Sequence, residues 1–246
     1  MRNFKITLRY EGTRYQGWQR QDSTSNTIQG KLEAILAKMT GKDFVQVDGS
    51  GRTDAGVHAL GQVANFKIDT DRTPQDIMNY VNQYLPEDIG VIAISEVSER
   101  FHSRLNARKK VYRYRIWNSP IPCVFERRYV HVVEELLDVE AMKRAAAHLM
   151  GTHDFKAFTS NKKSKKSTVR TIERIDIERT GEELALTYIG DGFLYHMVRI
   201  LTGTLIEVGL HKRSEASVEE LLENGTRELA GALAPAKGLC LVAVEY

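Results

Sequence analysis

Cysteine is scarce in this sequence. The two cysteines, Cys123 and Cys240, lie far apart, and no Cys-x-x-Cys pair occurs. This spacing excludes a zinc knuckle and a dithiol redox motif. A chain that does not depend on disulfides fits a reducing compartment.

Long apolar runs are also missing. No segment approaches the roughly 18 consecutive apolar residues that a membrane-spanning helix needs. The first residues lead directly into a strand-like alternation and show no apolar core of the kind found in a signal peptide. We therefore expect a cytoplasmic protein with no membrane partner.

Neither sign of charge is in large excess, since 35 basic and 32 acidic residues leave a net charge of +3. The distribution is uneven, because Arg104–Arg115 and Lys156–Arg170 each contain six basic residues and no acidic one. Acidic side chains gather elsewhere, for example at Glu219 and Glu223. A polarised surface of this kind suits a polyanion better than the net charge suggests. A single basic run, including Lys162–Lys166, is also common in solvated loops.

Apolar periodicity predicts a mixture of strands and helices within 246 residues, enough for one large domain or two modest ones. Segments 4–10, 63–68 and 111–117 read as strands, and 175–188 reads as a hairpin that turns near Thr180. Helices are expected after Asn26 or Thr27, after Thr73 and after Asp138, and Ser217 with Glu220 predicts a capping box.

The order strand, helix, strand, strand occurs in both halves of the chain, which hints at an internal duplication. These elements predict an α+β fold with an antiparallel sheet and helices packed on one face. No linker rich in glycine, proline or serine separates the halves, so we expect them to share one sheet. We divide the chain into 1–104 and 105–246 and expect the two halves to form one functional unit.

The segment Gly49–Ala59 holds the most distinctive group of polar residues. Its three glycines permit positive φ and close approach to a ligand, and Arg52 and Asp54 lie between them. Apolar strand-like segments flank this loop, which is where functional residues are commonly placed. In isolation, Asp54 could equally be a turn cap and Arg52 a surface charge.

A second unusual residue is Arg199, which lies in the least polar helix of the chain, framed by Gly192 and Gly209. A buried ion without a partner is very costly, and no acidic residue lies one helical turn away. We predict that Arg199 pairs with Asp54, and that the small residues Thr202 and Gly203 leave room for this approach. The alternative is that Arg199 extends to the surface and binds phosphate.

The segment Gly51–Ala59 resembles the signature of the pseudouridine synthases that act on the anticodon arm of transfer RNA, the bacterial tRNA pseudouridine synthase A type. The resemblance continues along the chain, although an aromatic residue is more usual at the position of Cys240, a difference that concerns packing more than chemistry. The further matching blocks, in order, are Tyr10–Gln19, Val111–Tyr114, Gly151–Phe155, Gly192–Arg199 and Gly238–Val242.

This resemblance implies two similar α/β halves that form a continuous antiparallel sheet with a central RNA-binding cleft. It implies a homodimer that binds tRNA across both subunits and isomerises uridine to pseudouridine at positions 38, 39 and 40. It further implies that Asp54 is essential and that no cofactor is required. No metal-ligand cluster is visible in the sequence, so we expect no metal.

The reaction requires that the base be cut from C1′, turned and rejoined through C5, and a stacked nucleotide must first be flipped out. Asp54 is then expected to act as nucleophile or base, and attack at C1′, attack at C6 and proton abstraction from C2′ all remain open. The resemblance assigns Arg52 to the space that the base leaves and Tyr112 to stacking on the flipped uracil. Tyr112 could otherwise be ordinary sheet packing, and His58 is expected to be structural.

Two other functions remain open at this point. The first is a non-catalytic protein that binds or folds RNA, and the second is the same chemistry on a different RNA. Zinc deaminases also flip bases, but the seven histidines include no His-x-Glu motif with paired cysteines.

Overall fold

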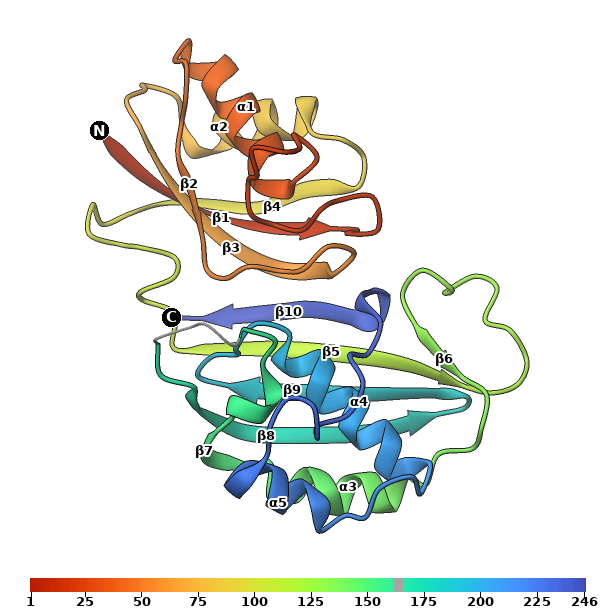
Figure 1. The fold of residues 1–246 in the computed structure, drawn as a ribbon. Helices are drawn as coiled ribbons and strands as arrows, with labels where there is room; N and C mark the ends of the chain where they lie inside the picture. The colour runs from red at the N-terminus through yellow and green to blue at the C-terminus, as the bar shows by residue number, and fades with distance from the viewer. Residues whose placement is uncertain (162–165) are drawn as a thin grey trace. The chain divides into compact units, whose positions relative to one another are not determined.

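The computed structural model describes residues 1–161 and 166–246. The predicted lysine-rich loop Lys162–Lys166 therefore lies outside the described residues except for Lys166. The chain forms two compact units, one made of residues 1–108 with 240–246 and the other of residues 109–239 (Figure 1). The last strand thus returns to the first unit, which a division by sequence position alone does not anticipate.

The first unit is built on a sheet in the strand order β4-β1-β3-β10, with the short strand β2 paired to β3. Neighbouring strands are antiparallel except for β10, which runs parallel to β3. The strands are β1 (Arg2–Tyr10), β2 (Val47–Gly49), β3 (His58–Ile68), β4 (Ile89–Val97) and β10 (Leu239–Glu245).

Two helices, α1 (Ile28–Thr40) and α2 (Pro74–Tyr84), cover one face of this sheet (Figure 1). Thr27 caps α1 by accepting a hydrogen bond from the amide of Gly30, and Gly41 ends the helix in the left-handed conformation at φ 68°. Apolar residues of both helices and of β1 and β3 form the core between the layers: Phe4, Ile6, Leu32, Leu36, Phe66, Ile77 and Val81.

The second unit has a sheet in the order β5-β9-β8-β7, with antiparallel neighbours and β6 added parallel to β5. Its hairpin turns at Gly181, which has φ 59°. The strands are β5 (Lys109–Asn118), β6 (His131–Val133), β7 (Gly151–Asp154), β8 (Val169–Thr180) and β9 (Glu183–Gly190).

Three helices accompany this second sheet: α3 (Val139–His148), α4 (Met197–Gly209) and α5 (Ser217–Asn224). Short 3-10 turns occur at Lys156–Phe158 and Ala236–Gly238. Asp138 caps α3 as predicted, since its side chain accepts from the amide of Ala141. The α+β class with antiparallel strands is therefore confirmed, while the continuity of the sheet between the halves and the central cleft stay predictions.

Two sequence predictions about helix starts are wrong. The predicted capping box at Ser217 is absent, because its hydroxyl donates to the carbonyl of Ser214 and Ala216 occupies the N-cap position. Helix α4 begins only at Met197, after His196 takes the left-handed conformation at φ 66°. The sequence predicts an earlier start because the apolar residues between Gly192 and His196 continue the helical period.

Helix α4 packs closely against the segment 230–235. The amide of Gly231 donates to Thr204 Oγ1, and a Cβ on Gly203 would lie 1.8 Å from the carbonyl oxygen of Ala232. Thr202 Oγ1 donates to the carbonyl of Val198 and lies 2.9 Å from the hydroxyl of a buried tyrosine on β9. The small residues of this helix therefore serve contacts inside the second unit.

We predict that Gly203→Ala destabilises the protein by about 1–3 kcal/mol or more, because the new methyl group overlaps a main-chain oxygen. Gly192→Ala is the matched control, since its new Cβ would lie 3.7 Å from Arg170 Nε, an ordinary van der Waals distance. Urea unfolding of both variants measures the difference. Equal midpoints would contradict the close packing described for α4.

Candidate active site

The buried side chain of Gln62 holds the first half of the loop between β2 and β3, residues 50–57. Gln62 Oε1 accepts from Ser50 Oγ at 2.7 Å, and Gln62 Nε2 donates to the carbonyl of Gly51 at 3.0 Å. The Ser50 amide donates to the carbonyl of Val63 at 2.8 Å. Because Ser50 and Gln62 are both fully buried, these bonds are shielded from water and fix the loop's entry.

The opening segment Tyr10–Gln19 holds the second half of the loop. The Tyr10 hydroxyl lies 2.8 Å from Thr53 Oγ1, and the Trp18 amide donates to the carbonyl of Thr53 at 3.0 Å. Burial raises the pKa of Tyr10 above its ordinary value, so the phenol stays protonated. Gly17 has φ 88°, and a Cβ there would lie 2.7 Å from the Thr53 carbonyl oxygen, so only glycine permits this approach.

His58 ties the same opening segment to the start of β3. Its Nδ1 accepts from the amide of Gly12 at 3.0 Å and lies 3.7 Å from the carboxylate of Glu11. The ring is buried, and in the neutral form its proton lies on Nε2. These contacts give His58 a structural position, as the sequence suggested.

Asp54 is half-buried at the turn of this fixed loop, and Arg52 is exposed two residues before it. The Arg52 Nε donates to Gln19 Oε1 at 3.0 Å, and Gln19 Nε2 donates to Gln29 Oε1 at 2.7 Å. Gln29 lies on α1 and donates to the carbonyl of Val47 at 2.9 Å. A chain of side-chain amides therefore connects the guanidinium of Arg52 to the core of the first unit.

Tyr112 and Arg199 belong to the second unit. Tyr112 lies on β5 opposite Tyr188 and is 8% exposed, and its ring meets the edge of Phe193 at a centroid distance of 5.3 Å. This contact is an ordinary edge-to-face aromatic pair and fixes the plane of the Tyr112 ring.

Arg199 is half-buried on α4, and its Nε donates to the carbonyl of Ala234 at 2.7 Å. The amide of Ala234 donates back to the Arg199 carbonyl at 3.2 Å. The hydroxyl of the neighbouring Tyr114 donates to the carbonyl of Pro235 at 2.8 Å. Burial raises the pKa of Tyr114, and the positive charge of Arg199 partly opposes this shift. The guanidinium is thus positioned by the segment that covers α4.

The four residues predicted from the sequence therefore divide between the units, with Arg52 and Asp54 in the first and Tyr112 and Arg199 in the second. Each has a well-defined place within its own unit. Sequence reasoning missed the supporting residues, above all Gln62. Gln62 lies within β3, and a glutamine inside an apolar strand is the signal that could have pointed to it, because an amide that becomes buried there requires partners.

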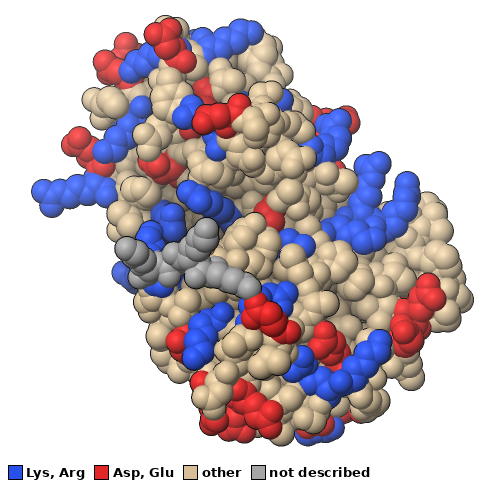
Figure 2. All heavy atoms as spheres, viewed as in Figure 1, with Lys and Arg blue, Asp and Glu red and all other residues tan. Residues whose placement is uncertain are grey.

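Part of the positive charge predicted for RNA binding is neutralised inside the second unit. Arg115 forms a two-point contact with Glu183 and a further ion pair with Glu126, which raises the pKa of the guanidinium further. Lys109 pairs with Glu173 at 2.7 Å. The exposed acidic side chains of α5 contribute to the red cluster at the lower end of Figure 2.

Among residues 1–161 and 166–246, no group of three or more His, Cys, Asp or Glu side chains could hold a metal ion. No helix in the same residues has both the length and the apolar character needed to cross a bilayer.

A family model described as tRNA pseudouridine synthase matches residues 6–106 and 145–246. The chain belongs to the tRNA pseudouridine synthase family. The matched residues include Arg52, Asp54 and Arg199. Tyr112 lies between the two matched regions.

Similar proteins span the whole chain. A tRNA pseudouridine synthase A 1 of Clostridium tetani is 47% identical, and a tRNA pseudouridine synthase A 2 of Bacillus cereus is 44% identical, each over 100% of both chains. Among solved structures, a chain of a Cbf5-Nop10-Gar1 complex has a TM-score of 0.38 and 12% identity, covering 97% of this chain and 48% of that one. This last likeness is too weak to support an argument.

We predict that Gln62→Leu lowers stability by about 1–3 kcal/mol, because Ser50 and the Gly51 carbonyl lose their buried partner. We also expect kcat on tRNA to fall roughly tenfold or more, since the loop that carries Asp54 loses its support. Gln75→Leu is the control, because Gln75 is exposed on α2 and its Nε2 donates to Asn79 Oδ1 at the surface. Unfolding curves and initial rates measure both effects, and equal kcat values for the two variants would contradict the supporting role of Gln62.

Proposed function

We propose that this protein isomerises uridine to pseudouridine at positions 38, 39 and 40 of the anticodon arm of tRNA. Membership of the family makes it an isomerase that acts on tRNA. The observation that carries the finer proposal is the position of Asp54, a half-buried carboxylate on a loop whose main chain is held from both sides. A fixed carboxylate of this kind is suited to react repeatedly with one atom of a substrate.

The proposed reaction breaks the bond between C1′ and N1 of a flipped-out uridine and forms a bond between C1′ and C5. C5 loses its proton and N1 gains one, so the product has the same atoms as the substrate. Asp54 supplies the carboxylate, as nucleophile or as base, and the three routes named above all use this group. No electron acceptor takes part, and we propose that the enzyme needs neither cofactor nor metal.

We propose that Arg52 enters the space that the base leaves and that Tyr112 stacks on the uracil. The contact of Arg52 with Gln19 supports the first role, because the hydrogen bond to Gln19 holds the exposed guanidinium of Arg52 in one direction. The contact of Tyr112 with Phe193 supports the second, because a ring with a fixed plane loses little freedom when a base stacks on it. Base stacking on an aromatic ring contributes about 1–3 kcal/mol.

The remaining proposals concern assembly and location. We propose that the halves 1–104 and 105–246 act as one catalytic unit with a central cleft, and that the protein is a cytoplasmic homodimer that binds tRNA across both subunits. The resemblance of the motif blocks to the tRNA pseudouridine synthase A type supports the homodimer, because that resemblance implies one.

We predict that Asp54→Asn lowers kcat on the order of a thousandfold or more and leaves tRNA affinity nearly unchanged. The carboxylate is lost while the size of the side chain and the loop that holds it are retained. Pseudouridine mapping on total tRNA, with and without the protein, measures the activity and identifies the positions. Full activity of the variant would contradict the proposed role of Asp54. Loss of wild-type activity in the presence of a chelator would contradict the proposal that no metal is needed.

The same mapping separates the other functions. A protein that only binds or folds RNA would produce no pseudouridine, and a protein that acts on another RNA would leave positions 38–40 unmodified while total RNA gains pseudouridine elsewhere.

We further propose that Arg199 pairs with Asp54 and fixes the direction of this carboxylate by a two-point hydrogen bond. The contact of its Nε with the Ala234 carbonyl supports this role, because it fixes the plane of the guanidinium. A lysine has neither the fork nor the Nε, so it cannot reproduce both contacts.

We predict that Arg199→Lys lowers kcat on the order of a hundredfold with little change in tRNA affinity. Arg213→Lys is the matched control, because Arg213 is also half-buried and bonds Glu207 and the Leu229 carbonyl. Steady-state kinetics and tRNA titration compare the two variants. A mild effect of Arg199→Lys, together with a raised KM for Arg199→Ala, would instead identify Arg199 as a phosphate contact.

A further inference from the structure

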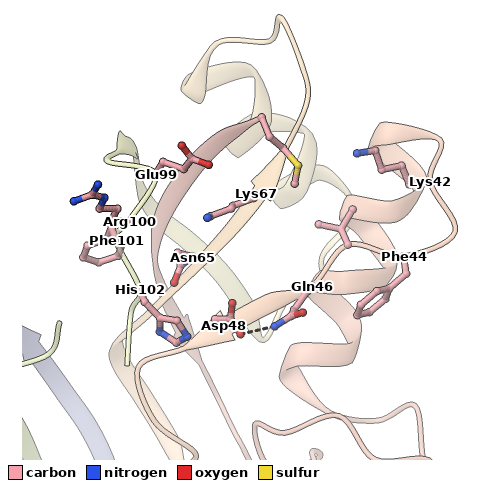
Figure 3. A pocket seen from close by; sticks show the side chains of 12 residues that line it. Lys42, Phe44, Gln46, Asp48, Asn65, Lys67, Glu99, Arg100, Phe101 and His102 are labelled. Carbon is pink, nitrogen blue, oxygen red and sulfur yellow. Dashed lines mark hydrogen bonds between the residues drawn. The ribbon is translucent and has the colours of Figure 1, made fainter. Parts of the chain in front are cut away.

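The first unit contains a pocket of about 700 Å³ that the proposed chemistry does not use (Figure 3). This volume lies within the range of about 300–1,000 Å³ typical of small-ligand sites. The pocket is lined by Met1, by residues of the segment 42–46 and of the adjoining strand β2, by residues of β3, and by the segment 99–102 that follows β4.

Strand alternation places the pocket on the sheet face opposite α1 and α2. Val47 of β2 pairs with Phe66 of β3, and both are buried in the core beneath the helices. Their neighbours Asp48, Asn65 and Lys67 therefore point to the other face, because successive side chains of a strand alternate. Figure 3 shows these three side chains directed toward the pocket.

The wall of the pocket is a fixed turn and not a free loop. Asn3 Nδ2 on β1 donates to the carbonyls of Ser98 and Phe101, both at 2.9 Å. Asn65 Oδ1 on β3 accepts from the amide and the hydroxyl of Ser103, both at 2.7 Å. Since both asparagines are buried, the turn that carries residues 99–102 is anchored to the sheet.

Basic side chains outnumber acidic ones in the lining of the pocket, three to two. Lys42, Lys67 and Arg100 line it, all three are exposed, and none forms an ion pair with a carboxylate in residues 1–161 or 166–246. Two carboxylates also line it, and that of Asp48 already accepts a hydrogen bond from Gln46 Nε2 at 2.8 Å. Cations without carboxylate partners around a concave site favour an anionic ligand such as a phosphate.

The remaining lining groups suit a nucleobase. Phe44 is 45% exposed, with the guanidinium of Arg20 lying 4.6 Å from its ring centroid. His102 Nδ1 accepts from the amide of Arg104 at 3.1 Å, so the neutral ring carries its donor on Nε2. The carboxylate of Glu99 is an acceptor for the amino group of a base. Aromatic rings interleaved with cations are typical of sites that bind single-stranded nucleic acid.

We propose that this pocket binds one unpaired nucleotide of the tRNA substrate other than the target uridine, with Lys42 and Lys67 on its phosphate and Phe44 against its base. This inference rests on the proposed function. Asp48 belongs to β2, and the loop that carries Asp54 begins directly after this strand. The pocket and the loop therefore have a fixed relation within one unit, and a nucleotide held in the pocket positions the RNA on the loop.

The test compares Lys42→Gln/Lys67→Gln with the wild type in tRNA titrations across a salt series and in steady-state kinetics. We expect KM to rise roughly tenfold with kcat unchanged, and the log–log salt slope to fall by about 0.7–0.9, as the loss of one neutralised phosphate requires. The control is Lys38→Gln, because Lys38 lies on α1, on the helix-covered side, with its amino group 4.6 Å from the Tyr84 ring centroid. Equal KM and slope in the double variant and the control would overturn the proposal.

Ultraviolet crosslinking of bound tRNA, followed by peptide mapping, provides a second readout. We expect a crosslinked peptide that contains Phe44, and its loss in Phe44→Leu. Crosslinks confined to other peptides would overturn the proposal. Binding of inorganic phosphate or of a free mononucleotide that leaves tRNA affinity unchanged would also overturn it, because it would identify a small-molecule site.

These outcomes are distinct from a failure of the proposed function. If the wild type forms pseudouridine while the double variant binds tRNA normally, only the pocket proposal fails. If the wild type forms no pseudouridine in tRNA, the proposed function fails.

Discussion

The structure depends on the way in which buried polar side chains hold the loop that carries Asp54. Gln62 bonds the first half of this loop, and Tyr10 with the main chain of Trp18 bonds Thr53 in the second. Each of these groups is buried, so an unmade bond would leave a desolvated polar atom at substantial cost. The loop is thereby restricted to one conformation before any substrate arrives, which is the condition under which a single carboxylate can act efficiently.

The second unit shows the same principle with a cation. Arg199 lies on a mostly apolar helix, and the carbonyl of Ala234 accepts a hydrogen bond from its Nε and so directs the guanidinium. Gly203 of the same helix packs closely against Ala232. The glycine and the arginine therefore both contact the segment 230–235. Basic residues elsewhere are divided, since some, like Arg115, are used in internal ion pairs and others remain available at the surface.

Local patterns in the sequence predicted much of the fold. The cap at Thr27 and the hairpin turn near Thr180 follow from short-range chemistry and are confirmed. The pairing of β10 with β3 and the partners of Gln62 join residues distant in sequence, which no local pattern encodes. The start of α4 was misplaced because apolar residues before Met197 continue a helical period that the left-handed residue interrupts. The site residues were found through motif spacing, whereas the amides that support them were not, because a glutamine has no distinctive spacing.

The central claim is that Asp54 reacts with a uridine turned out of the anticodon arm. A crystal structure of Asp54→Asn bound to tRNA tests this claim most directly, because the variant keeps the loop and stops the reaction. The account predicts uridine 38, 39 or 40 outside the stack, with C1′ or C6 in contact with the side chain at position 54 and Arg52 in the vacated space. A target uridine that remains stacked and paired, or one whose ribose and base lie out of reach of position 54, would contradict it.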